Sequence, residues 1–243
     1  MERHITTLRG EAALAAAVFV NSFGVVLMLY SGAGISAISS VPYAFSESFP
    51  ALSLGMWTFA FQSLLVANLM FLRGRFVAEY IFSFAVGFAF GAAMDFHESW
   101  IAMLPGGLVW RVLYFFVSWF IICFGIALSN RCKMPIIPTD LFPRELAEIT
   151  GVSYPKIKIS FDVICLAVTA ALTFCFLGEV RGLGVGTVAA AFTMGKGVGV
   201  IGEWMDGRVR FVSVLSRRGA ARRMQRDKNF CIAAINAQSA PHL

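Results

Sequence analysis

Six long apolar segments constrain the fold of this chain more than any other feature. They cover residues 11–35, 51–72, 76–94, 108–129, 157–177 and 183–204. A helix needs about 20 apolar residues to cross a hydrocarbon core, and in lipid its backbone must satisfy its own hydrogen bonds. Of the 243 residues, 58 % are hydrophobic and only 14 % are charged, whereas about 25 % are charged in a soluble domain. We therefore predict an all-α, polytopic membrane protein with six transmembrane helices.

Loops rich in Lys and Arg alternate along the chain with loops that have almost none, so most of the positive charge lies on one side of the bundle. The N-terminus, the second loop, the fourth loop and the tail hold nearly all of the Lys and Arg residues outside the spans, and Arg181 in the fifth loop is the exception. Cytoplasmic loops are enriched in Lys and Arg. The distribution predicts six spans with both termini in the cytoplasm.

Three pairs of short matches, in the same order, indicate an internal duplication. "FGVVL" at 23–27 matches "FGIAL" at 124–128, Ser53 matches Ser153, and Phe61 matches Phe161. The glycine pair at 87 and 91 matches the pair at 195 and 199. We predict two three-helix repeats, 1–105 and 106–206, and a basic cytoplasmic tail, 207–243. Because each repeat has an odd number of spans, the two are expected to be inverted, as in many transporters.

Each predicted repeat contains a Pro-rich interruption. In the second, Pro143 suits a first helical position and Gly151 suits a C-terminal cap, so a short helix is expected with Asp140 near its positive end. It is either a surface helix or a re-entrant element that lines a polar pathway. Non-helical backbone at membrane depth is tolerated only beside protein or a water-filled cavity.

Two ionisable residues lie at similar depths inside predicted spans. Asp162 and Lys196 are each expected about 10 Å from the cytoplasmic face, at 1.5 Å per residue, and they would form an ion pair that is either structural or part of a transport path. Gln62 is the uncharged counterpart of Asp162 in the first repeat. The residues that we expect to line a transport path are Pro42, Gln62, Pro138, Asp140, Asp162 and Lys196.

Longer stretches of the chain resemble the YczE/YyaS/YitT family of bacterial multi-pass membrane proteins. The stretches are "GIALSNRCKMPIIPTDLFPRELAEITGVS", "GLGVGTVAAAFTMGKGVGV" and "YSGAGISAISSVPYAF". The resemblance implies the inverted-repeat fold and the bacterial cytoplasmic (inner) membrane. The family's Pro-x-Asp element is matched by Pro138 to Asp140, whereas the first copy at Pro42 lacks the Asp.

The remaining charged motifs have plain interpretations. Asp95, His97 and Glu98 in "DFHES" fit a solvated outer loop, with a metal site as the alternative. The tail's basic residues with interleaved apolar ones suit an amphipathic helix on anionic inner-leaflet lipids, and nucleic-acid binding is the alternative. We find no nucleophile–base set and no cofactor motif, and expect neither an enzyme nor a cofactor.

The function that these features favour is a transporter or facilitator for a small polar or ionic solute, with its site between the two repeats. The alternative is a non-transporting accessory or regulatory membrane protein that acts through partner or lipid contacts. The expected partners are the bilayer, anionic lipids at the tail and the solute; a homo-oligomer is compatible with the pattern, and no nucleic acid is expected.

Overall fold

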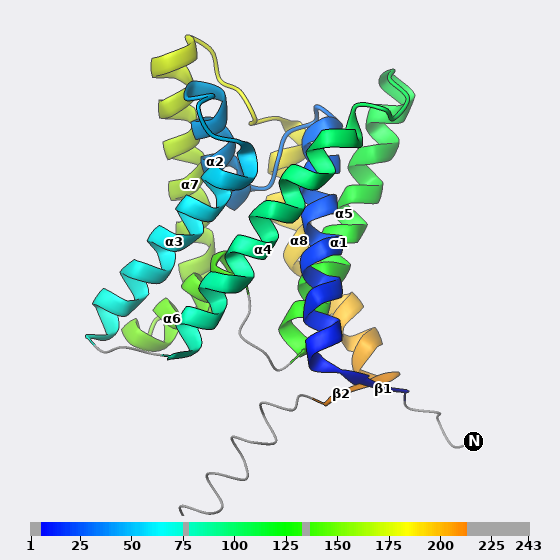
Figure 1. Ribbon diagram of the computed structural model, residues 1–243, viewed down its shortest axis with the longest axis vertical. Coiled ribbons are helices and arrows are strands. Elements are labelled where there is room, and N and C mark those ends of the chain that lie inside the picture. Colours follow the sequence, from blue (N-terminus) through cyan, green and yellow to red (C-terminus); the bar gives the residue numbers. More distant parts are fainter. Residues whose placement is uncertain (1–5, 75–77, 133–136, 213–243) are drawn as a thin grey trace, which may run out of the picture.

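The computed structural model describes residues 6–74, 78–132 and 137–212, and most of these residues are helical. Six helices are long and apolar enough to cross a membrane. They are α1 (Gly10–Tyr30), α3 (Leu54–Arg73), α4 (Ala78–Ile101), α5 (Leu108–Arg131), α7 (Tyr154–Leu177) and α8 (Val185–Asp206). The described chain also holds the short helices α2 (Ala37–Ser48) and α6 (Pro138–Thr150) and the strands β1 (Thr6–Arg9) and β2 (Val209–Val212) (Figure 1). The chain is therefore a helical, multi-pass membrane protein.

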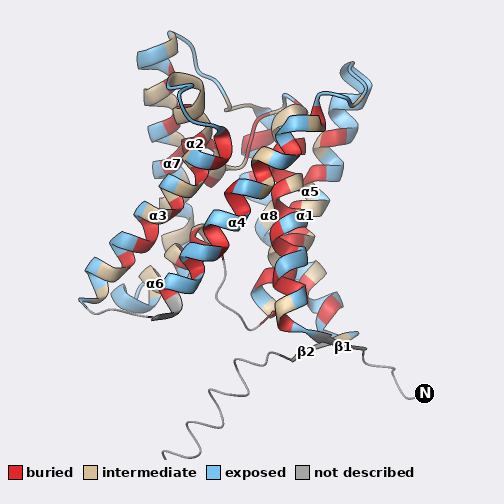
Figure 2. Cartoon of the chain, in the orientation of Figure 1, coloured by how far each residue is buried: buried red, intermediate tan, exposed pale blue. Residues whose placement is uncertain are grey.

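Large apolar side chains cover the outside of the long helices. Phe71, Phe116 and Phe192, on three different helices, are 84 %, 63 % and 78 % exposed. Exposed residues run along the outer faces of the bundle, while buried ones gather where helices meet (Figure 2). Such a surface is unfavourable in water and favourable in lipid, because the hydrophobic effect opposes exposing apolar area to water.

The eight helices form two groups of four. In one group α1 packs against α4 and α5, and α5 packs against α8. In the other, α2 and α6 each pack against α3 and α7. The helices α3 and α4 join the two groups, whereas α7 and α8 hardly touch within the described residues (Figure 1).

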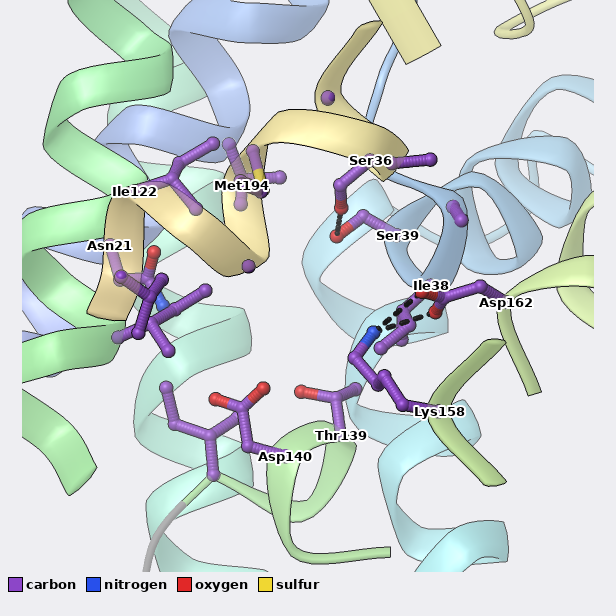
Figure 3. A pocket seen from close by; sticks show the side chains of 18 of the residues that line it. Asn21, Ser36, Ile38, Ser39, Ile122, Thr139, Asp140, Lys158, Asp162 and Met194 are labelled. Carbon is purple, nitrogen blue, oxygen red and sulfur yellow. Dashed lines mark hydrogen bonds and ion pairs between the residues drawn. The ribbon is translucent and has the colours of Figure 1, made fainter. Parts of the chain in front are cut away.

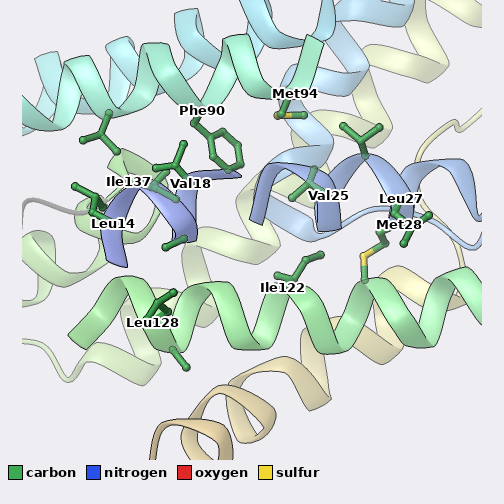
Figure 4. Packing of buried hydrophobic residues seen from close by; sticks show 14 of the residues in the cluster. Leu14, Val18, Val25, Leu27, Met28, Phe90, Met94, Ile122, Leu128 and Ile137 are labelled. Atoms are coloured by element: carbon green, nitrogen blue, oxygen red, sulfur yellow. The ribbon is translucent and has the colours of Figure 1, made fainter. Parts of the chain in front are cut away.

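The helices α1 and α5 of the first group cross at close range. A Cβ added at Gly24 would lie 2.7 Å from Ile122 Cγ1, and one added at Gly125 would lie 3.0 Å from Asn21 Cβ. Buried Val25 and the other members of the same apolar cluster pack around this crossing (Figure 4). Small residues let two backbones approach in lipid, where close packing rather than the hydrophobic effect holds helices together.

The short helix α6 begins earlier than the sequence predicted. Pro138 occupies its first turn and Pro143 lies inside it, so the expected start at Pro143 is wrong. The sequence rule is satisfied by Pro138 instead, because its missing N–H costs nothing at a helix start. The predicted cap at Gly151 is confirmed, and its φ of +70° is the left-handed conformation that favours glycine.

The "DFHES" segment is helical and belongs to α4, so the prediction of a solvated outer loop is wrong. Asp95 accepts hydrogen bonds from Ser53 Oγ and the Gly55 N–H, which ties this turn of α4 to α3. The His97 ring is 2 % exposed and lies 4.6 Å from the Phe19 ring centroid. Packing on both sides therefore extends the helix beyond the apolar segment.

The start of the tail also differs from the expected amphipathic helix. Residues 209–212 form β2, which pairs in parallel with β1, and Thr6 lies opposite Val209. The two described ends of the chain therefore lie side by side at one end of the bundle (Figure 1). The rest of the tail, 213–243, is outside the described residues.

Glycine backbone forms the contact between α3 and α4. A Cβ added at Gly91 would lie 2.5 Å from the Gly55 carbonyl oxygen, and one added at Gly87 would lie 2.6 Å from Gln62 Oε1. Among the described residues, no atom lies within 4 Å of a Cβ added at the matching glycines on α8, Gly195 and Gly199. The same small-residue pair is thus buried in one half of the chain and open in the other.

This difference predicts opposite effects of one substitution at two matched sites. Gly91→Ala should lower the thermal unfolding midpoint in detergent, because overpacking a tight contact typically costs about 1–3 kcal/mol. Gly199→Ala is the control and should not lower it, since Ala is the better helix former by about 1 kcal/mol. Equal destabilisation by the two variants would contradict the packing described.

Candidate functional site

A cavity of about 510 Å³ lies between the two groups of helices. All eight helices contribute to its lining, which is mostly apolar with a few polar groups. Asn21, Ile122 and Met194 form one wall, and Lys158 and Asp162 face them from the other group (Figure 3). Concave, mostly apolar sites with a few placed polar groups are typical of small-molecule binding.

The short helices α2 and α6 both turn their first residues towards this cavity. Ser36 and Ser39 line it from α2, and Thr139 and Asp140 line it from α6 (Figure 3). Within the described residues, neither helix has a side-chain hydrogen bond that caps its first turn. The Ser36 hydroxyl donates instead to Ser39 Oγ at 2.9 Å. The first turn of an uncapped helix carries free N–H groups and partial positive charge. The N-termini of both short helices therefore point these groups at the same cavity.

Each short helix also contains one internal proline at the same place. Pro42 is the sixth residue of α2, counted from Ala37, and Pro143 is the sixth of α6, counted from Pro138. A proline has no N–H to donate to the carbonyl four residues earlier. Those carbonyls belong to Ile38 and Thr139, which both line the cavity. The structural counterpart of Pro42 is therefore Pro143 rather than Pro138.

Asp140 places an unpaired carboxylate at the cavity. Among the described residues, none forms a hydrogen bond or ion pair with it. Burial raises the pKa of the Asp140 carboxyl above its usual range; Lys158 lowers it, Asp162 raises it and Arg144 lowers it. Desolvation favours the neutral form of a carboxyl, so this group binds a proton more readily than an exposed aspartate does.

Asp162 lines the cavity but does not form the expected ion pair with Lys196. Its carboxylate accepts two hydrogen bonds from Lys158 Nζ, at 2.7 and 2.8 Å, one helical turn away on α7. Lys196 is exposed on α8 and is not part of the lining. The prediction of the pair is wrong because it assumed that α7 and α8 are neighbours. The four-residue spacing of Lys158 and Asp162 on one helix could have predicted the ion pair that the structure contains, because residues four apart are neighbours on a helix surface.

Two side-chain amides reach the cavity with unpaired atoms. Gln62 is 1 % exposed, and neither its oxygen nor its nitrogen has a hydrogen-bond partner in the described protein. Asn21 is 5 % exposed and its Oδ1 is also unpaired. A buried polar group without a partner costs about 1–3 kcal/mol, and native proteins retain few of them. Both amides are thus available to a solute.

The structure brings together most of the residues that the sequence singled out. Pro42, Gln62, Asp140 and Asp162 line the cavity. Pro138 is buried next to these residues. A Cβ added at Gly87 would lie 2.6 Å from Gln62 Oε1 and 3.4 Å from Pro138 Cγ, so Pro138 and Gln62 meet at this glycine. Sequence reasoning did not place Ser36, Ser39, Asn130 or Lys158 there, because these residues meet only through the tertiary arrangement.

A second cavity adjoins the first towards one end of the bundle, and at the other end two segments of the chain are hydrogen-bonded to each other. The second cavity, of about 240 Å³, shares Ile126, Asn130 and Asp140 with the first and adds Arg144. At the opposite end the segment after α1 closes against the segment before α8. There the Ile35 N–H donates to the Gly182 carbonyl at 3.1 Å, and the Gly186 N–H donates to the Ala33 carbonyl at 2.8 Å.

The raised pKa of Asp140 predicts a pH-dependent stability. A carboxyl whose pKa is higher in the folded than in the unfolded protein stabilises the fold at low pH, and this contribution is lost as pH rises through the folded-state pKa. Asp140→Asn stays neutral, so its unfolding midpoint should match the wild type at a pH low enough to protonate the carboxyl in both states, and should exceed it increasingly as the pH rises towards the folded-state pKa. Thermal unfolding across pH measures the difference. Glu148→Gln, an exposed change on the same helix, is the control; a pH-independent difference for Asp140→Asn would contradict the assignment.

The unpaired amide of Gln62 predicts that a non-polar substitution stabilises the protein. Gln62→Leu should raise the free energy of unfolding by about 1–3 kcal/mol, because it removes the desolvation penalty of both amide atoms. Chemical denaturation in detergent measures the change. A clear loss of stability would show that the native fold depends on this amide.

A family described as a family of unknown function (DUF6198) matches residues 8–203. No curated protein and no solved structure matches the chain.

Proposed function

We propose that this chain, which belongs to the DUF6198 family of unknown function, is a membrane transporter or facilitator for a small polar or ionic solute. The observation that carries the proposal is the cavity to which all eight helices contribute, where the amides of Gln62 and Asn21 and the carboxylate of Asp140 have polar atoms without a partner among the described residues. Unpaired polar groups are costly inside a membrane protein, and their convergence on one space is expected of a substrate pathway.

The helix pairings support two inverted repeats, 1–105 and 106–206, of three spans and one short helix each. The order of long and short helices from α1 to α4 recurs from α5 to α8. In the first half α1 packs on α4 and α2 packs on α3. In the second half, correspondingly, α5 packs on α8 and α6 packs on α7. Across the halves, α2 packs on α7 as α6 packs on α3.

The crossing of α1 and α5 supports the same relation at the level of residues. Gly24 meets Ile122 and Gly125 meets Asn21. The two glycines are 101 residues apart, and so are Asn21 and Ile122. Exchanged contacts of this kind are the property of an interface with twofold symmetry. The YczE/YyaS/YitT-like stretches of the sequence are consistent with this arrangement.

The distribution of charge supports a bacterial cytoplasmic membrane with both termini inside. Arg73, Arg131 and Arg144 lie at the end of the bundle that carries β1 and β2, and Arg181 lies at the other end. Positive residues favour the cytoplasmic side. On this orientation the cavity leads towards the cytoplasm, and the basic tail meets anionic inner-leaflet lipids.

Solute flux into proteoliposomes tests the proposal. The probes are radiolabelled glycerol, urea, alanine, choline and inorganic phosphate, which cover neutral, zwitterionic, cationic and anionic solutes. We expect the wild type to move at least one probe, and Asp140→Asn or Asp162→Asn to slow that flux at least tenfold. Glu148→Gln lies outside the cavity and should retain it. Equal flux in all variants, or none above empty liposomes for any probe, would overturn the proposal.

A further inference from the structure

We propose that two pairs of residues, Ser53 with Asp95 and Ser153 with Glu203, act as alternating latches. One pair closes at a time, and the cavity is thereby open to one side of the membrane at a time. This inference rests on the proposed transport function, since it names the residues that control access to the same site.

The first latch is closed in this structure. Ser53 Oγ donates to Asp95 Oδ2 at 2.7 Å, and the Gly55 N–H donates to Asp95 Oδ1 at 2.7 Å. Ser53 is also the N-terminal cap of α3, because its Oγ accepts from the Met56 N–H. The carboxylate on α4 is therefore held by the first turn of α3, at the end of the bundle away from β1 and β2 (Figure 1).

The second half repeats these residues at the matching positions. Ser153, 100 residues after Ser53, is the residue before α7. Glu203, 108 residues after Asp95, is on the last turns of α8, and the same offset relates Gly87 and Gly91 to Gly195 and Gly199. A serine at a helix start and a carboxylate on the following span thus occur twice.

The second latch is open. Ser153 makes no side-chain capping bond, and among the described residues none forms a hydrogen bond or ion pair with the Glu203 carboxylate. Both residues are exposed. They lie at the end of the bundle that carries β1 and β2, where α7 and α8 hardly touch in the described chain. This is also the end towards which the cavity continues.

A movement of one helix group against the other exchanges the two latches. The group of α2, α3, α6 and α7 would part from α4 at Asp95 and close on α8 at Glu203. Gly195 and Gly199 line the cavity and leave room for α7, as Gly87 and Gly91 do for α3. Packed groups of helices tend to have two discrete arrangements rather than a continuum.

The second latch is not an identical copy of the first. The counterpart of Gly55 is Pro155, which has no N–H to donate. The hydroxyl of Ser153 remains, and Lys156 in the first turn of α7 is exposed and supplies a positive charge. Glu203 would then be held by one hydroxyl and one ammonium group instead of a hydroxyl and a backbone N–H.

Cross-linking in native membranes tests whether the second latch closes. The double variants Ser53→Cys/Asp95→Cys and Ser153→Cys/Glu203→Cys are treated with a short bismaleimide, and each single variant controls for the native cysteines. Both double variants are expected to cross-link within the chain. Gly199→Leu should reduce the second cross-link at least fivefold and leave the first unchanged, because it fills the space that α7 needs.

A reporter inside the cavity tests whether the two latches exclude each other. Ser39→Cys is labelled with a membrane-impermeant maleimide from either side of oriented vesicles. With the first pair cross-linked, labelling should come from the side of β1 and β2; with the second pair cross-linked, it should come at least tenfold faster from the other side.

Either of two results would overturn the latches: no cross-link between positions 153 and 203 under conditions that join 53 and 95, or unchanged sidedness of labelling after both cross-links. Neither readout requires solute flux. Alternating accessibility without flux of any probe would therefore count against the proposed transport function and for the latches.

Discussion

Hydrocarbon accepts a helix only when its backbone groups are paired, and α2 and α6 depart from that condition where they line the cavity. Both short helices start without a side-chain cap and both contain a proline that frees a carbonyl. Such elements are stable only when protein surrounds them, and here α3 and α7 pack on both. The six spans therefore act as the support that lets two interrupted helices present polar backbone to one cavity.

On the proposed relation between the two halves, the backbone is arranged more symmetrically than the charges. Ser39 on α2 would correspond to Asp140 on α6, and Gln62 on α3 to Asp162 on α7, at offsets of 101 and 100 residues. In each case the first half supplies a neutral polar group and the second half supplies a carboxylate, with Lys158 beside Asp162. The charged side chains that line the cavity thus lie on α6 and α7, and burial raises the pKa of one of them, the Asp140 carboxyl.

The sequence predicted the elements well because lipid imposes a length and a polarity on each span. It placed six spans and a short helix ending at Gly151, and the structure has them. It failed where tertiary contacts decide: the turns after Asp95 are helical because α3 and aromatic rings hold them, which no apolar run shows. The sequence also predicted the wrong ion-pair partner for Asp162, because the order of the spans along the chain does not determine which helices are neighbours in the bundle.

The site was partly predictable for the same reason. Ionisable and proline residues within apolar segments are few, so Asp140, Asp162 and Pro42 stood out, and all three line the cavity. Gln62 stood out only through its match with Asp162. The serines at the start of α2 and Asn130 at the end of α5 have ordinary surroundings in the sequence, and only the crossing of the two helix groups brings them to the cavity.

The open glycines of α8 argue that this arrangement is one of two. A glycine inside a helix is unfavourable by about 1 kcal/mol relative to alanine. On α4 that cost is offset, because Gly91 lets the backbone of α3 approach. On α8 no contact within the described part of the chain offsets it, since no described atom lies within 4 Å of a Cβ added at Gly195 or Gly199. A helix that carries two such residues one turn apart gains from them only in a conformation where α7 packs against it.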